Sequence, residues 1–465
     1  MTYQAKTFFK RWLMAATSLL LVSTSSLIYA NNPLTKQLDA LLDDRRSVTE
    51  LAGMQVVLIN DGDITFNYAK GMAHQSEDGL ITPLTTQHKV RVASISKFVM
   101  TLGFMTLVES GQVDLNRDVS DYLGFKLRNP NFPEHPITAT QLLSHTSSIR
   151  DAGVYFLPYG AQFQDFFQPS KHYLEGAHFA SGNNRAPGQF FNYSNLNFGI
   201  LAGIIENVSG ERFDKFMDRV IFKPLSLEIS FNNCRFANMN HKHIATLYRR
   251  GVGGATWDPD GPWIPQVDDT LRLCYYGGPK VSSSVAHNLD ELKDYQLGSN
   301  PTLFSPQGGL RASATDLATL AQLLLSEDDL AGRDKNAILS RQAIQQMLAP
   351  VWQYRADKKN GHTGGEADPS DISQLNLQRT YGLSTHIIDL KQWGLADEQS
   401  VWYGHMAAAY GLLGQLWINP KTNQGIIILL TGMGDNPGAV PRTTPMEEVE
   451  AQVLRLALAA LKNPG

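Results

Sequence analysis

The sequence contains only two cysteines, Cys234 and Cys274, and neither stands in surroundings typical of a catalytic thiol. A cysteine nucleophile is therefore disfavoured. In an exported protein, a disulfide between them would close a loop of about forty residues and stabilise the fold by about 3–4 kcal/mol on the loop-entropy argument. Two buried free thiols are the alternative, and the sequence leaves both open.

An excess of positive charge is also absent. The 465 residues include 40 lysines and arginines against 44 acidic residues, a formal net charge of −4. This balance excludes a strongly basic, nucleic-acid-binding protein. Hydrophobic residues make up 43% of the chain and charged residues 18%, which is typical of a globular protein with one or two lobes.

The N-terminal apolar run is too short to span a membrane. It extends from Trp12 to Val22, about eleven residues where a spanning helix needs about twenty. Basic residues precede it, and a stretch of small and polar residues follows and ends at Ala30. This layout is typical of a secretory signal peptide over residues 1–30, with no cysteine for a lipid anchor. We expect an exported protein, periplasmic or secreted, with no stable membrane span after cleavage, whose catalytic domain is residues 31–465.

Strand patterns occur near both ends of the chain, and helical patterns occupy the middle. The predicted strands are Met54 to Asn60, Ile64 to Gly71, Lys89 to Ala93, Tyr381 to Ile388, Tyr410 to Ile418 and Gly425 to Thr431. The predicted helices are Pro33 to Arg46, Ser94 to Ser110, Asn195 to Val208, Ser313 to Leu325, Arg341 to Leu348 and Met446 to Leu461. The region from about Asn232 to Ser305 is rich in Gly, Pro, Asp and Trp, and we expect a long loop there.

This order predicts an α+β fold in which one sheet is assembled from both ends of the chain. Helices cover the sheet, and a mainly helical lobe is inserted. We expect a sheet lobe over about 31–112 plus 350–465, and a helical lobe over about 113–349.

The first candidate motif is Ser94-Ile95-Ser96-Lys97, at the start of a helix that is apolar on nearly all sides. Residues three apart at a helix start share a face, so the Ser94 hydroxyl and the Lys97 amine should meet. A lysine in the first turn opposes the helix dipole and is rarely buried without function. Burial and the dipole favour the neutral amine, which can take a proton from Ser94. The alternative is a Ser94 N-cap followed by a surface lysine.

The second candidate motif is Tyr193-Ser194-Asn195, just before a predicted helix. The Tyr193 phenol can relay a proton to a leaving group, and the Asn195 amide can hydrogen-bond a substrate carbonyl. Taken alone, this motif is more typical of a tyrosine that packs its ring and an asparagine N-cap.

The third motif should lie on a strand beside the nucleophile and end in small residues, so that a backbone N–H can face the acyl oxygen. Two segments fit: Gly361 to Gly365, which contains His362, and Gly404 to Ala408, which contains His405. Only the second runs into a predicted strand, hairpin and final helix. We therefore predict that His405 and Ala408 contact the substrate.

The three motifs and their order resemble the serine β-lactamase and penicillin-binding-protein superfamily. The closest resemblance is to its class C-like branch, with D-aminopeptidases, D,D-carboxypeptidases and esterases. The stretches Gly111 to Leu115, Leu142 to Ser147 and Gly308 to Ser313 are similar too. The resemblance implies a β-lactamase/transpeptidase-like fold, an antiparallel sheet flanked by helices, and a covalent acyl-enzyme mechanism without a cofactor.

Carried over residue by residue, the resemblance makes Ser94 the nucleophile and Lys97 its base or proton relay. Tyr193 would be the second acid/base, and Asn195 would bind substrate. The oxyanion hole would consist of the backbone N–H groups of Ser94 and Ala408. The resemblance also places His145 in a segment that is usually structural.

The third motif departs from the family pattern, because His405-Met406-Ala407 stands where relatives often have K-T-G or H-T-G. An imidazole with an ordinary pKa of about 6.5 is mostly neutral at pH 7 and offers a hydrogen bond more than a charge. If His405 binds a carboxylate, affinity should rise below about pH 6.5.

We therefore expect a serine hydrolase, an esterase or D-amino-acid peptidase rather than an efficient β-lactamase. Its substrate would be a small ester, amide or peptide, which the cell wall could supply. The alternative is a penicillin- or peptide-binding sensor on the same scaffold that does not hydrolyse its ligand. A metal hydrolase is disfavoured, because the pair His241 and His243 lacks a partner carboxylate.

Overall fold

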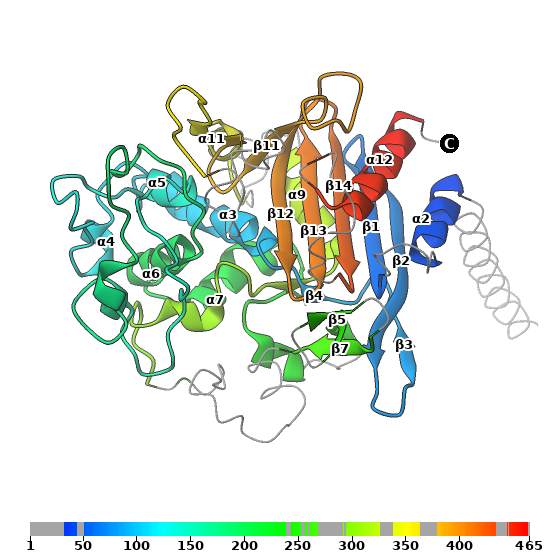
Figure 1. The fold of residues 1–465 in the computed structure, drawn as a ribbon, viewed down its shortest axis with the longest axis horizontal. Helices are drawn as coiled ribbons and strands as arrows, with labels where there is room; N and C mark the ends of the chain where they lie inside the picture. The colour runs from blue at the N-terminus through cyan, green and yellow to red at the C-terminus, as the bar shows by residue number, and fades with distance from the viewer. Residues whose placement is uncertain are drawn as a thin grey trace, which may run out of the picture.

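A nine-stranded antiparallel sheet lies at the centre of the described residues in a computed structural model of the protein (Figure 1). The structure describes residues 32–43, 51–238, 243–252, 256–258, 261–267, 292, 294–325, 338–362, 379–433, 444 and 446–463. The order of the strands across the sheet is β3-β2-β1-β14-β13-β12-β11-β10-β9.

The strands of this sheet are β1 (Gly53–Asn60), β2 (Asp63–Gln75), β3 (Ile81–Pro83), β9 (Trp352–Gln353), β10 (Thr380–Tyr381), β11 (His386–Asp389), β12 (Val401–Ala409), β13 (Leu412–Asn419) and β14 (Gln424–Thr431). Smaller sheets contain β4 (Val90–Arg91), β5 (Leu247–Val252), β6 (Thr256–Trp257), β7 (Trp263–Gln266) and β8 (Arg311–Ala312). The helices are α2 (Pro33–Asp43), α3 (Ile95–Glu109), α4 (Ser120–Leu123), α5 (Ala139–Leu143), α6 (Leu196–Ser209), α7 (Phe213–Met217), α9 (Ala314–Leu325), α11 (Arg341–Leu348) and α12 (Glu448–Lys462).

The two ends of the chain meet in the middle of the sheet, as the sequence predicted. Strand β1 pairs with β2 on one side and with β14 on the other, so that Met54 lies opposite Leu430. Alternate residues of β1 face opposite layers: Val56 packs with α2 and α12, and Val57 packs with the helices of the other face. Burial on both faces explains why these strands read as nearly continuous apolar runs.

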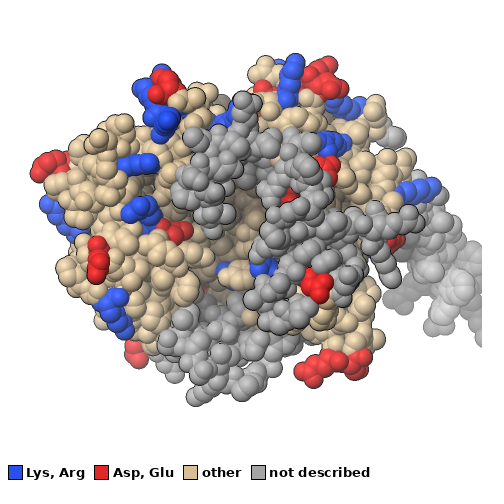
Figure 2. Space-filling view, in the orientation of Figure 1, with Lys and Arg blue, Asp and Glu red and all other residues tan. Residues whose placement is uncertain are grey.

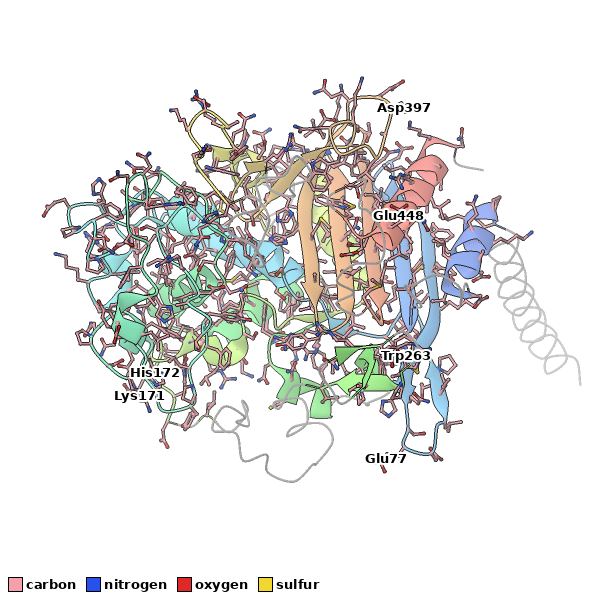
Figure 3. The ribbon with its side chains drawn as sticks, viewed as in Figure 1. Glu77, Lys171, His172, Trp263, Asp397 and Glu448 are labelled. Carbon is pink, nitrogen blue, oxygen red and sulfur yellow. The ribbon has the colours of Figure 1, made fainter. Side chains whose placement is uncertain are left out.

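The helical region and the sheet can also be located by labelled side chains. In Figure 3, His172 lies in the helical region on the left, and Glu448 lies beside the sheet on the right. On the face shown in Figure 2, basic and acidic side chains are scattered among uncharged ones, in keeping with the small net charge.

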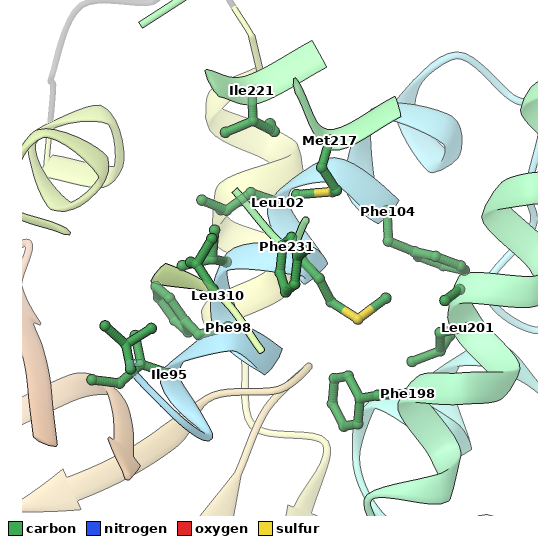
Figure 4. Packing of buried hydrophobic residues seen from close by; sticks show 14 of the residues in the cluster. Ile95, Phe98, Leu102, Phe104, Phe198, Leu201, Met217, Ile221, Phe231 and Leu310 are labelled. Atoms are coloured by element: carbon green, nitrogen blue, oxygen red, sulfur yellow. The ribbon is translucent and has the colours of Figure 1, made fainter. Parts of the chain in front are cut away.

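Helix α3 lies between the sheet and the other helices and is buried on nearly all sides (Figure 4). It contacts β12 and β13 at one end, and α6 and α7 along its length. Gly103 permits the close approach of α7, because a Cβ at this position would lie 2.4 Å from Met217 Sδ. The core holds α3 on all sides, so the residues at its first turn have a fixed position.

Three predicted elements need correction. The described part of the expected loop from Asn232 to Ser305 includes a three-stranded sheet of β5, β6 and β7. The single strand expected at Tyr381 to Ile388 is two strands, because the backbone turns at Ser384 with φ of 51° and its N–H donates to the Leu143 carbonyl. The strand expected from Tyr410 begins at Leu412, because Tyr410 and Gly411 form the turn after β12.

Of the two cysteines, Cys234 is buried and disulfide-bonded. Cys274 lies outside the described residues, as do the proposed signal peptide and His241. Among the described helices, none has both the length and the apolar character that crossing a membrane requires.

Helix α6 contains a fully buried carboxylate, Glu206. It accepts hydrogen bonds from the backbone N–H groups of Phe213 and Gly298, at 2.9 and 2.7 Å, and from the Tyr295 hydroxyl at 2.7 Å. Burial raises the pKa of Glu206 to about 7, in spite of these three donors.

Glu206 therefore predicts a pH-dependent stability. The unfolded carboxyl loses its proton near pH 4.5, whereas the folded one keeps it to about pH 7. Between these values the folded chain binds more protons, so its free energy of unfolding falls as the pH rises, by about 3 kcal/mol from this group. In Glu206→Gln, urea denaturation at pH 5 and pH 7 should show a smaller difference than in the wild type. Glu211→Gln, at a surface ion pair with Arg219, is the control; an undiminished difference in Glu206→Gln would assign the pH dependence to other groups.

Candidate active site

Ser94 and Lys97 meet at the start of α3. The Lys97 Nζ donates a hydrogen bond to Ser94 Oγ at 3.0 Å. The Ser94 hydroxyl does not cap the helix, so the simple N-cap alternative is wrong. Ala93, just before the nucleophile, has φ of 44°, a conformation that costs a residue with a Cβ about 1–2 kcal/mol. This turn places the half-buried Ser94 at the helix start.

Lys97 is fully buried. Besides Ser94, its Nζ donates to the Gln307 carbonyl at 2.9 Å. The segment that carries Gln307 is fixed to the same helix start, because the Leu310 N–H donates to Ser96 Oγ and Arg91 Nε donates to the Gly308 carbonyl. The amine therefore has a defined position in a site with little water.

Tyr193 lies beside the amine. The Lys97 Nζ is 4.8 Å from the centre of the Tyr193 ring, and the ring stacks on His145 with centroids 4.2 Å apart. The Ser194 N–H donates to His145 Nδ1 at 3.0 Å. Burial, helped by the charge of Lys97, lowers the pKa of His145 well below its usual value, so the neutral ring can accept this bond. His145 supports Tyr193, in line with the structural role that the resemblance implies.

Asp151 fixes the rest of the Tyr193 loop, although no sequence motif pointed to this residue. Its carboxylate accepts three hydrogen bonds of 2.9 Å, from Ser194 Oγ, Asn195 Nδ2 and the Leu196 N–H. Asn195 stands at the start of α6, and its side chain does not cap the helix. The bond to Asp151 orients the Asn195 amide, because the Nδ2 end is held and the Oδ1 end is directed the other way.

We expect Asp151→Ala to lower the free energy of unfolding by about 3 kcal/mol, because hydrogen bonds to a charged group contribute about 1.5–3 kcal/mol each and are not additive. Turnover of an ester should fall about tenfold as the Tyr193 loop loosens. Asp151→Asn, which keeps one acceptor, should recover part of both losses. The matched control is Asp121→Ala, which removes an exposed ion pair with Arg117 and should cost under about 1 kcal/mol. Equal losses in the Asp151→Ala and Asp121→Ala proteins would contradict this role.

His405 is fully buried on β12, and its ring centre lies 6.4 Å from that of Tyr193, so the contact with substrate stays a prediction. Its Nδ1 is 2.6 Å from the Met406 carbonyl oxygen, which can only accept, so Nδ1 carries the proton. Its Nε2 then accepts from the Tyr381 hydroxyl at 3.1 Å. Burial, with His386 and Lys97 nearby, lowers the pKa of His405 well below 6.5. Burial therefore disfavours the charged ring, and the pH dependence of carboxylate affinity stays a prediction.

Ala408 is exposed, near the end of β12. Gly414 of the neighbouring strand lies between Ala407 and Ile95, since a Cβ on it would be 3.3 Å from Ala407 Cβ and 3.2 Å from Ile95 Cδ1. The start of α3 thus packs on the strand that carries Ala408. Strand β11 pairs with β12 only as far as Gly404.

His362, in the alternative third motif, lies beside the Tyr193 loop instead. Its N–H donates to the Phe191 carbonyl at 2.9 Å, and its ring contacts Phe190. The rest of that motif, from Thr363, is outside the described residues.

Residues 38–451 match the Beta-lactamase family. The chain belongs to the β-lactamase family. This match spans all the candidate site residues and confirms the resemblance on which the three motifs were assigned.

Individual relatives of this β-lactamase-family chain are distant. It is 26% identical over 220 residues to Protein flp of Staphylococcus aureus (strain N315), a match over 47% of this chain and 42% of that protein. It is 26% identical over 243 residues to Esterase EstB of Burkholderia gladioli, over 50% of this chain and 59% of that protein. The matches thus span less than two thirds of either relative.

Among solved structures, the D-amino acid amidase from Ochrobactrum anthropi SV3 complexed with L-phenylalanine amide superposes with a TM-score of 0.61 at 16% identity. The superposition covers 93% of this chain and 99% of the amidase. At this identity the likeness shows the fold, and it confirms the predicted α+β fold with an antiparallel sheet flanked by helices.

A large pocket in the described part of this β-lactamase-family chain does not lie at Ser94. It has a volume of about 1160 Å³ and lies between α11, α12 and the strands β11 to β14. Ser94, Lys97 and Tyr193 do not line it. The chemistry of the site, and not pocket size, identifies the candidate active site.

Proposed function

We propose that this protein is a serine hydrolase that forms a covalent acyl-enzyme at Ser94 with an ester, amide or peptide substrate. The observation that supports the proposal is the hydrogen bond between the fully buried Lys97 Nζ and Ser94 Oγ, with Tyr193 beside the amine. A surface lysine would not need to be buried next to Ser94, and a tyrosine that only packs would not need to lie beside the lysine amine.

In the proposed reaction, neutral Lys97 takes the hydroxyl proton as Ser94 Oγ bonds to the substrate carbonyl carbon. The backbone N–H groups of Ser94 and Ala408 stabilise the oxyanion, and the Asn195 amide oxygen positions the substrate. The bond to the leaving group breaks as Tyr193 supplies a proton to it. Water then attacks the acyl-enzyme as Tyr193 takes a proton from it, and Lys97 returns its proton to Ser94 Oγ as the ester bond breaks.

The third motif supports an esterase or peptidase over an efficient β-lactamase. His405 is neutral and its two ring nitrogens are already hydrogen-bonded, to Tyr381 and the Met406 carbonyl. Met406 has a thioether, whereas the threonine of the K-T-G or H-T-G pattern has a hydroxyl that can donate a hydrogen bond. The third motif therefore offers a carboxylate no cationic side chain of its own, and charge-assisted bonds are about twice as strong as neutral ones. The names of two relatives, an esterase and a D-amino acid amidase, agree with this class. We also propose that the protein is exported, on the basis of residues 1–30.

The test compares turnover of a neutral activated ester with turnover of a penicillin. We expect measurable ester hydrolysis, and slow or no penicillin hydrolysis. Mass spectrometry during the penicillin reaction gives the lifetime of the adduct. A long-lived adduct without ester turnover would favour a sensor, and penicillin hydrolysis as efficient as ester hydrolysis would contradict the substrate class.

A further inference from the structure

A second, smaller pocket lies next to the Tyr193 loop, with a volume of about 140 Å³. Asn192, which precedes Tyr193 directly, is one of its lining residues. The others are Ser148, Arg150, Ala180, Ser181, Arg185, Phe190 and His362. It is separate from the large pocket, with which it shares no residue.

The described lining residues of the pocket include two guanidinium groups and no acidic side chain. Arg185 stacks on Phe190, its Cζ 3.3 Å from the ring centre, and it makes no hydrogen bond or ion pair within the described part of the chain. Arg150 donates one N–H to the Phe179 carbonyl at 2.8 Å and has no ion pair there either. Burial and the nearby charge of Arg150 lower the pKa of Arg185. Within the described part of the chain, two cations are thus held close together without an ion pair to an acidic side chain.

The walls of the pocket are fixed by the backbone. The Ala180 N–H donates to the Ser148 carbonyl and the Arg150 N–H to the His178 carbonyl, both within 2.9 Å. Across the pocket, the Asn192 N–H donates to the His145 carbonyl at 2.8 Å. Asn129 Nδ2 also donates to Ser148 Oγ and to the Ala180 carbonyl. The site is therefore built in advance, which lowers the ordering cost of binding.

One residue of this pocket, Asn192, directly precedes Tyr193, the proposed proton relay, in the chain. Stacking on Phe190 orients Arg185, and the edge of a guanidinium matches a carboxylate through two parallel N–H donors. His405 of the third motif is buried and neutral, so it cannot supply the positive charge that would attract a carboxylate.

We propose that this pocket, formed around Arg150 and Arg185, binds a carboxylate group of the substrate that acylates Ser94. The proposal rests on the proposed function. It narrows the substrate class to esters, amides or peptides that carry a carboxylate away from the reacting carbonyl.

The test uses pairs of 4-nitrophenyl esters that differ only in their terminal group. The 4-nitrophenyl monoesters of adipic and suberic acid are compared with the hexanoyl and octanoyl esters, and the readout is the ratio of kcat/KM for the anionic to the neutral ester. We expect this ratio to fall at least tenfold in Arg185→Gln and in Arg150→Gln for one or both chain lengths. Arg117→Gln, an exposed arginine paired with Asp121, is the control and should keep the wild-type ratio. An unchanged ratio in both pocket variants would overturn the proposal.

Calorimetric titration with adipate tests binding without turnover. If the wild type hydrolyses none of the esters, the proposed function fails. Adipate binding then tests independently whether the pocket binds a carboxylate. Binding that is at least tenfold weaker in Arg185→Gln supports the carboxylate site; equal or no binding overturns it. Inorganic sulfate is the third arm: sulfate binding that depends on Arg185, together with an unchanged ester ratio, would identify a free-anion site and overturn the substrate assignment.

Discussion

Ser94→Ala and Lys97→Ala are each expected to abolish turnover of an activated ester. Ser94 supplies the oxygen that forms the acyl-enzyme, and the Lys97 Nζ, 3.0 Å away, is the group placed to take its proton. Residues that act as a unit are strongly non-additive, so the double variant should be little slower than either single one. The measurement is the steady-state rate of ester hydrolysis by each variant.

The structure predicts different stabilities for these two variants, which provides a control. Ser94 is half-buried and does not cap α3, so Ser94→Ala should unfold at nearly the wild-type denaturant concentration. Lys97 is fully buried and bonded to the Gln307 carbonyl, so Lys97→Ala leaves an acceptor unpaired at a cost of about 1–3 kcal/mol. Loss of activity in a folded Ser94→Ala protein is therefore informative by itself. Wild-type turnover by this variant would exclude the proposed mechanism.

Tyr193→Phe is expected to slow ester turnover by about a hundred- to ten-thousand-fold, the usual range for loss of a general acid or base. Phenylalanine keeps the ring that stacks on His145 at 4.2 Å, so it removes the hydroxyl and preserves the packing. The effect should be on kcat more than on KM, because the hydroxyl acts on the leaving group in the transition state.

Tyr193→Leu is the matched variant that removes the ring as well. If Tyr193 relays a proton, Tyr193→Phe and Tyr193→Leu should lose activity to a similar extent, although only the second should lose stability. A loss under threefold in Tyr193→Phe, with a large loss in Tyr193→Leu, would show that the residue only packs.

Much of the fold could be predicted because its signals are local. The apolar run of α3 indicated a central helix, and Asp61, Gly62 and Asp63 between two strand patterns mark the turn that joins β1 and β2. The pairing of β1 with β14 was predictable because strand patterns occur at both ends of the chain. The first two motifs could be located in the fold because each stands at the start of a predicted helix.

The errors arose where the tertiary structure decides. The single strand expected from Tyr381 to Ile388 breaks at Ser384, because the Ser384 N–H pairs with the Leu143 carbonyl of a distant segment. Asp151 is a single polar residue in a loop, and its role depends on Ser194 and Asn195, more than forty residues away along the chain. No periodic pattern records such a contact.

The central claim, that Ser94 is the acylated nucleophile, is tested most directly by mass spectrometry of the full chain after reaction with a fluorophosphonate. We predict one covalent adduct in the wild type, on the peptide that contains Ser94, and none in Ser94→Ala. An adduct of equal yield in Ser94→Ala, or a wild-type adduct on a different residue, would contradict the account.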